Sequence, residues 1–87
     1  MAVVWIPAGM RSLSNGDAQA TVPGATLREV LDNLELRYPG FRTQVVWGEL
    51  IRNDIAVAID GDVIHQGLFQ PVEPASEVHF LPALSGG

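Results

Sequence analysis

The last three residues of this 87-residue chain, Ser85, Gly86 and Gly87, are the part of the sequence best suited to chemistry. They follow an apolar run over residues 78–84. Glycine has no Cβ, so two terminal glycines let the backbone extend into a narrow channel of a partner and present an unhindered carboxylate. A carboxylate is inert until it is activated. The alternative is that the glycines are incidental, because chain ends are free to vary.

Composition limits what the rest of the chain can be. Eighty-seven residues with 47% hydrophobic content form one domain with a modest core. The chain has no cysteine, so disulfides, thiolate metal ligands and a thiol nucleophile are excluded. The first seven residues lack the basic and apolar regions of a signal peptide, and no run is long enough to span a membrane. We therefore expect a cytoplasmic protein.

The charge balance indicates which kinds of partner the chain can bind. Ten acidic residues against five arginines give a net charge of −5, which disfavours nucleic acid and favours partners with basic faces. Lysine is absent, which excludes a phosphate-binding P-loop. The N-terminal amine is then the only primary amine that could attack an activated tail of the same protein. The alternative is that the genome favours arginine over lysine, which would explain the absence of lysine equally well.

The clearest predicted element is a helix after residue 26. Thr26 and Glu29 have the spacing of a capping box, in which the threonine caps the helix and the glutamate reaches back to the amide of the cap. Pro39 and Gly40 stop the helix. An apolar stripe at helical spacing predicts a face that packs on the core. The stripe consists of Leu27, Val30, Leu31, Leu34 and Tyr38.

Strands are predicted on both sides of this helix. The run 2–7 is apolar on both faces, with Val3, Trp5 and Pro7 on one side, and it forms a hairpin with residues 18–22. The later segments are a loop with some local structure at 41–53, a buried strand at 55–59, a turn at 60–62, a short return strand at 63–64, a loop at 67–76 and a last strand at 77–81. One helix and about five strands predict an α+β fold, with a mixed sheet packed on one face against the helix.

Other constellations are weaker. His65 and His79 do not share a ligand spacing, so no metal site is expected. Asp60 and Asp62 flank a turn glycine, where acidic residues serve turn geometry. No serine lies in a nucleophile elbow. The chain is therefore not expected to be an enzyme or to bind a cofactor.

Several of these segments together resemble the small sulfur carriers of the ubiquitin-like β-grasp group, which includes the molybdopterin synthase small subunit and the thiamine-pathway sulfur carrier. The most specific is residues 77–87, where a strand of the pattern Glu-Val-x-apolar-apolar-Pro leads into Gly-Gly. Residues 6–16, 25–40 and 55–61 are similar to the first hairpin, the helix and an apolar strand of the molybdopterin-synthase-like branch. Residues 74–76 depart from the family pattern, and residues 43–53 are not diagnostic.

The resemblance implies a β-grasp domain over residues 1–84 and a flexible carrier tail over residues 85–87. It also implies that an E1-like activating enzyme uses ATP to adenylate Gly87. A sulfur donor then displaces AMP and leaves a C-terminal thiocarboxylate. Gly86 has to pass through the same narrow channel. A sulfur-accepting synthase, such as the large subunit of molybdopterin synthase, draws the sulfur from the tail.

A second expected role is docking. Leu81 and His79 should lie on the face of the last strand away from the helix, with Leu84 and Ser85 at its exit, where they would contact partners. The alternative for Leu81 is packing under the loop 67–76. Three functions stay open: a sulfur carrier, a ubiquitin-like modifier joined to proteins through Gly87, and a passive binding module. The acceptor could be a molybdenum-cofactor or thiazole precursor, or belong to an amino-acid or tRNA pathway.

Overall fold

The computed structural model describes residues 1–83. The strands are β1 (Ala2–Trp5), β2 (Gln19–Val22), β3 (Val46–Trp47), β4 (Leu50–Ile51), β5 (Ile55–Ile59), β6 (Asp62–Val63) and β7 (Glu77–Pro82); the α-helix is α1 (Leu27–Arg37), and the short 3-10 helices are η1 (Ala8–Met10), η2 (Arg42–Gln44) and η3 (Gly67–Phe69).

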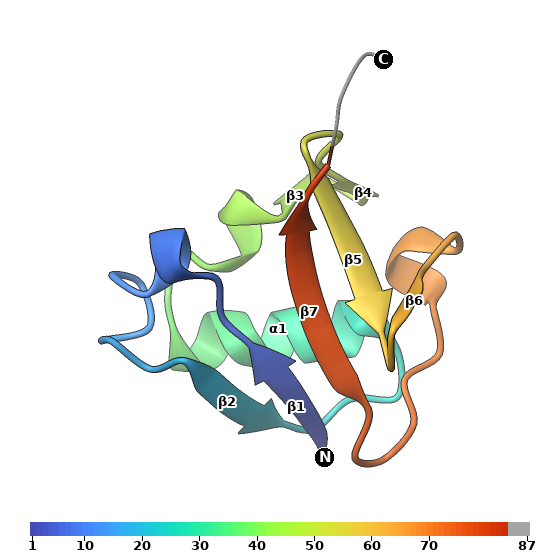
Figure 1. Cartoon of the computed structure of the whole chain (residues 1–87), viewed down its shortest axis with the longest axis horizontal. Coiled ribbons are helices and arrows are strands. Elements are labelled where there is room, and N and C mark those ends of the chain that lie inside the picture. Colours follow the sequence, from blue (N-terminus) through green and yellow to red (C-terminus); the bar gives the residue numbers. More distant parts are fainter. Residues whose placement is uncertain (84–87) are drawn as a thin grey trace.

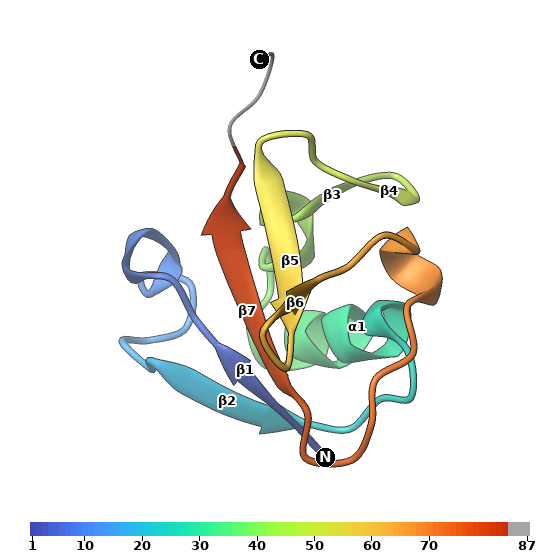
Figure 2. The same cartoon turned by 45° about the vertical axis from the view of Figure 1, so that its right-hand side comes forward.

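The principal sheet has five strands in the order β2-β1-β7-β5-β6. Its strand β1 pairs antiparallel with β2 and parallel with β7, whereas β5 pairs antiparallel with both β7 and β6. The helix α1 lies across one face of this sheet (Figures 1 and 2). The expected α+β architecture, a mixed sheet of about five strands packed on one helix, is confirmed.

The helix begins and ends as its sequence indicates, with one correction. The Thr26 side chain caps the helix by accepting from the Glu29 N–H at 3.3 Å. Glu29 does not reach back to the amide of Thr26; it accepts from the N–H of Ala25, one residue earlier, at 3.2 Å. The chain enters α1 through an isolated bridge between Thr26 and Pro71.

The core lies between α1 and the inner face of the sheet. Alternate residues of the central strands point toward the helix, so Val4 and Val78 are fully buried. Phe41, which follows the helix, packs edge-on against Phe80 with ring centroids 5.8 Å apart. The helix contributes the predicted stripe, all of it buried: Leu27, Val30, Leu31, Leu34 and Tyr38.

The segment 41–53, predicted as a loop with some local structure, contains η2 and a two-stranded sheet made of β3 and β4. The two strands pair antiparallel, with Val46 opposite Ile51 and Trp47 opposite Leu50. Two-residue strands are too short for an alternating pattern to be visible, which explains why the sequence did not predict them.

Candidate functional site

The strand β7 places the tail. It runs between β1 and β5 and extends one residue beyond the predicted bound, to Pro82, which lies opposite Ile55. The N–H of Ala83 then donates to the carbonyl oxygen of Asp54 at 2.9 Å, so pairing with the start of β5 continues up to the last described residue. Leu84, Ser85, Gly86 and Gly87 lie outside the described residues. We call the end of the molecule around Asp54, Pro82 and Ala83 the tail end.

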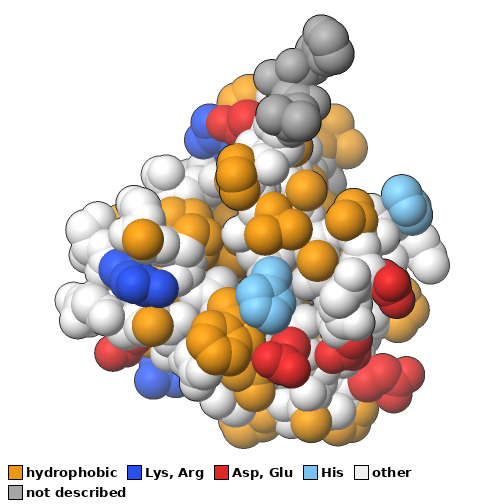
Figure 3. Space-filling model, in the orientation of Figure 1, with side chains coloured by type: hydrophobic (Ala, Val, Ile, Leu, Met, Phe, Trp, Pro, Cys, Tyr) orange, Lys and Arg blue, Asp and Glu red, His pale blue; other side chains and the backbone are white. Residues whose placement is uncertain are grey.

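His79 and Leu81 lie on the sheet face opposite α1, as expected. Leu81 is 42% exposed and His79 is half-buried, whereas Val78 and Phe80 between them are buried against the helix. Figure 3 shows hydrophobic side chains gathered over β7 and β5 on this face. We call this face of the sheet, opposite α1, the open face. It continues along β7 to the tail end.

Trp5 belongs to the same open face, which the sequence alone did not reveal. The parallel pairing of β1 with β7 sets Trp5 opposite His79, and the two rings stack with centroids 5.6 Å apart at an interplanar angle of 8°. The Trp5 Nε1 donates to Glu77 Oε1 at 2.9 Å. The predicted alternation of strand 2–7 grouped Trp5 with Val3 and Pro7 without indicating which side faces the helix, and the stack itself depends on which strand lies beside β1.

Leu81 also lines a small apolar groove of about 220 Å³ beside the tail end. The groove joins residues from the start of the chain to the end of β7, and none of its residues comes from the loop 67–76. Leu81 therefore does not pack under that loop. The lining residues are Pro7, Met10, Asp54, Ile55, Phe80, Leu81 and Pro82.

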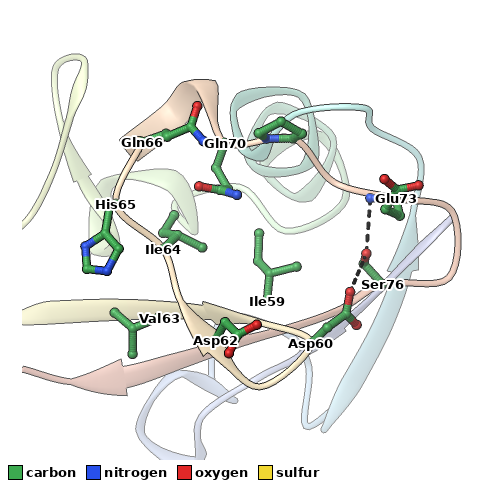
Figure 4. A pocket seen from close by; sticks show the side chains of 11 residues that line it. Ile59, Asp60, Asp62, Val63, Ile64, His65, Gln66, Gln70, Glu73 and Ser76 are labelled. Carbon is green, nitrogen blue, oxygen red and sulfur yellow. Dashed lines mark hydrogen bonds between the residues drawn. The ribbon is translucent and has the colours of Figure 1, made fainter.

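A larger hollow of about 450 Å³ lies between β6 and the segment 64–76, and it is polar (Figure 4). The carboxylate of Asp60 accepts from the Glu77 N–H at 2.9 Å and from the Ser76 hydroxyl at 2.8 Å. The bond from the Glu77 N–H, which has the larger effect, and the bond from the Ser76 hydroxyl hold the pKa of the Asp60 carboxyl below its ordinary value. Asp60 and Gly61 both have positive φ, so Asp60 serves the turn, as predicted.

Within residues 1–83 no group of three or more His, Cys, Asp or Glu side chains could hold a metal ion. The histidines are apart: His65 is exposed at the polar hollow, and His79 stacks on Trp5. The expectation that no metal or cofactor is bound stays a prediction. None of the helices formed by these residues has the length and apolar character needed to cross a membrane.

Comparison with known families decides where the chain belongs. The model of the ThiS family matches residues 4–87, which is nearly the whole chain. The chain belongs to the ThiS family. These ubiquitin-like proteins are small sulfur carriers, so the predicted resemblance and the β-grasp fold are confirmed.

Solved structures agree with this assignment. The chain is 28% identical to a protein in the Amycolatopsis orientalis BexX/CysO complex, with a TM-score of 0.92 and full coverage of both chains. It is 21% identical to Mycobacterium tuberculosis CysO, with a TM-score of 0.89 and coverage of 97% and 100%. It is 24% identical to small archaeal modifier protein 1 from Methanosarcina acetivorans, with a TM-score of 0.79 and coverage of 99% and 95%. No curated protein matches the sequence.

Proposed function

We propose that this ThiS-family chain carries sulfur as a thiocarboxylate on Gly87. The observation that supports it most is the family match, which extends through the terminal Gly86 and Gly87. The described part of the chain fits the role, because β7 delivers the backbone to the tail end beside an apolar open face. Most of the chain acts as a rigid base for a short tail.

The chemistry requires partners at each step. An E1-like enzyme joins the Gly87 carboxylate to the α-phosphate of ATP, and pyrophosphate leaves. Sulfide, the donor in the test below, attacks the acyl carbon, the bond to the AMP phosphate breaks with release of AMP, and the sulfur remains as a thiocarboxylate. On the accepting synthase the sulfur forms its new bond to the acceptor, and water then hydrolyses the bond between the sulfur and the acyl carbon, which restores the carboxylate. In this proposal the chain itself contributes no general acid, base or metal to these steps. The use of ATP in the activation step supports a cytoplasmic location.

Partner docking would use the open face. Trp5, His79 and Leu81 form a surface of aromatic and aliphatic groups next to the tail end, and such groups are enriched in the buried centres of interfaces. The net charge of −5 favours partners with basic rims around this centre. The complex of a similar protein with BexX supports a carrier that works through protein partners.

A second candidate function uses the same activation. The similarity to an archaeal modifier protein favours conjugation, in which an amine of a target attacks the activated Gly87 and forms an amide. Covalent adducts of higher mass that resist thiols would distinguish conjugation from sulfur transfer. The acceptor pathway, whether it makes molybdenum cofactor, thiamine or another product, is left open by both candidates.

The test is the intact mass of the purified protein after incubation with extract of its host cells, ATP and sodium sulfide. We expect the mass gain of one oxygen exchanged for one sulfur. A variant lacking Gly87 should fold normally and gain nothing, and Gly86→Ala should behave in the same way, because a side chain would obstruct the channel. Sulfur loading of the Gly87-deleted protein would contradict the proposal, and an unchanged mass of the wild type would favour a passive binding module.

A further inference from the structure

The hairpin formed by β3 and β4 exposes two large apolar side chains. Trp47 is 57% exposed and Leu50 is 74% exposed, and the two residues lie opposite each other in the hairpin. The hairpin is also tied to the body of the domain, because Glu49 in its turn forms an ion pair with Arg28 of α1. An exposed indole on an anchored element is a feature of binding surfaces.

A chain of contacts joins this indole to the tail end. The Arg52 guanidinium stacks over the Trp47 ring, 4.9 Å from its centroid. The same guanidinium makes two hydrogen bonds to the Asp54 carboxylate, at 3.1 Å and 3.0 Å. The Asp54 carbonyl oxygen accepts from the N–H of Ala83 at 2.9 Å. Figure 1 shows β3 and β4 at the same end of the molecule as the C-terminal end of β7.

The length of the tail limits where a partner can sit. Four residues follow Ala83, and a fully extended chain spans at most about 3.6 Å per residue, so Gly87 reaches no more than about 14 Å from the domain. An interface of ordinary size covers about 800 Å² on each partner, which corresponds to a disc with a radius of about 16 Å. An interface centred on the tail end therefore also covers the hairpin, which adjoins it through Arg52 and Asp54.

We propose that Trp47, backed by Arg52, is an anchor for the activating enzyme that receives the tail. The inference rests on the proposed function. Tryptophan and arginine are over-represented among the few residues that dominate binding energy. Because Asp54 neutralises Arg52, the matching pocket on the enzyme should be apolar rather than acidic. The segment 43–53, which is not diagnostic in sequence, then determines which enzyme the carrier fits.

A competition experiment tests this proposal. Wild type and one variant are mixed at equal concentration with limiting host-cell extract, ATP and sodium sulfide, and intact mass follows sulfur loading of both proteins at once. The ratio of the initial rates equals the ratio of kcat/KM. Trp47→Ala should load about tenfold more slowly, which corresponds to 1.4 kcal/mol of lost binding. Trp47→Phe, which keeps a ring, should stay within about threefold of wild type.

Leu36→Ala is the matched control. Leu36 is 82% exposed but belongs to α1, outside the hairpin and the tail end. We expect it to load within about twofold of wild type, as surface substitutions away from a binding site do. Circular dichroism checks that all variants are folded at the assay temperature. Equal loading of Trp47→Ala and wild type, or an equal loss in Leu36→Ala, would overturn the anchor. No loading of wild type would overturn the proposed function and the anchor with it.

Discussion

Two neighbouring residues of β7 separate the role of the fold from the role of the surface. Phe80 is 6% exposed and faces α1, where its ring meets that of Phe41 edge-on at 5.8 Å. Leu81 is 42% exposed and faces outward beside the tail end. We predict that Phe80→Ala strongly lowers stability and leaves the open face intact, whereas Leu81→Ala lowers stability only slightly and weakens docking.

The magnitudes follow from burial. Truncation of a buried phenylalanine costs about 3 kcal/mol or more, because it removes apolar contacts and leaves a cavity. In a domain of this size each 1 kcal/mol moves the melting temperature by about 4–8 °C, so Phe80→Ala should melt about 12–24 °C lower. For Leu81→Ala, where much of the side chain already contacts water, about 1 kcal/mol and a shift of no more than about 8 °C are expected.

The assays are thermal unfolding followed by circular dichroism, and sulfur loading at a temperature where both variants are folded. Leu81→Ala should load about tenfold more slowly than wild type if it contributes to docking. Folded Phe80→Ala should load within about threefold of wild type, since it keeps the docking residues Trp5, His79 and Leu81 and changes only the floor of the groove. Equal melting shifts in the two variants would refute the assignment of Phe80 and Leu81 to opposite faces. Unchanged loading by Leu81→Ala would refute its role in docking.

Two further predictions concern the helix. Gly24→Ala should lower the free energy of unfolding by about 2 kcal/mol, because Gly24 has a φ of +157° and an added Cβ would lie 2.8 Å from the Val30 backbone nitrogen. Its urea unfolding midpoint should be lower than that of Gly9→Ala, in which the added Cβ meets nothing within 4 Å. Equal midpoints for the two variants would contradict the clash. Hydrogen bonds from the Gly40 N–H, the larger influence, and from the Arg42 N–H keep the pKa of the Glu35 carboxyl below its ordinary 4.5. The ionised Glu35 carboxylate therefore stabilises the folded protein above pH 4.5, and this contribution is lost as the pH falls through the folded-state pKa. Glu35→Gln should therefore lose less stability than wild type on acidification below about pH 4.5, as measured by urea midpoints across pH; parallel losses would count against this carboxylate.

The elements with a strong local pattern were predictable. The stripe and cap of α1 are visible because its residues repeat with the helical period and because Thr26 precedes the first turn. The alternation in β7 likewise assigned His79 and Leu81 to the face opposite the helix. Segment 41–53 lacks such a pattern, since β3 and β4 contain two residues each, and its hairpin became visible only in the structure.

The sequence by itself determined the α+β class, the faces of the helix and of the last strand, and the glycine tail, because these depend on local periodicity and residue type. Only the tertiary structure decided which distant groups meet. The stack of Trp5 on His79, the groove shared by Met10 and Leu81, and the bond from the Ala83 N–H to the Asp54 carbonyl oxygen all depend on strand order and register. Strand partners far apart in the chain are chosen by packing of the whole core, which no local pattern specifies.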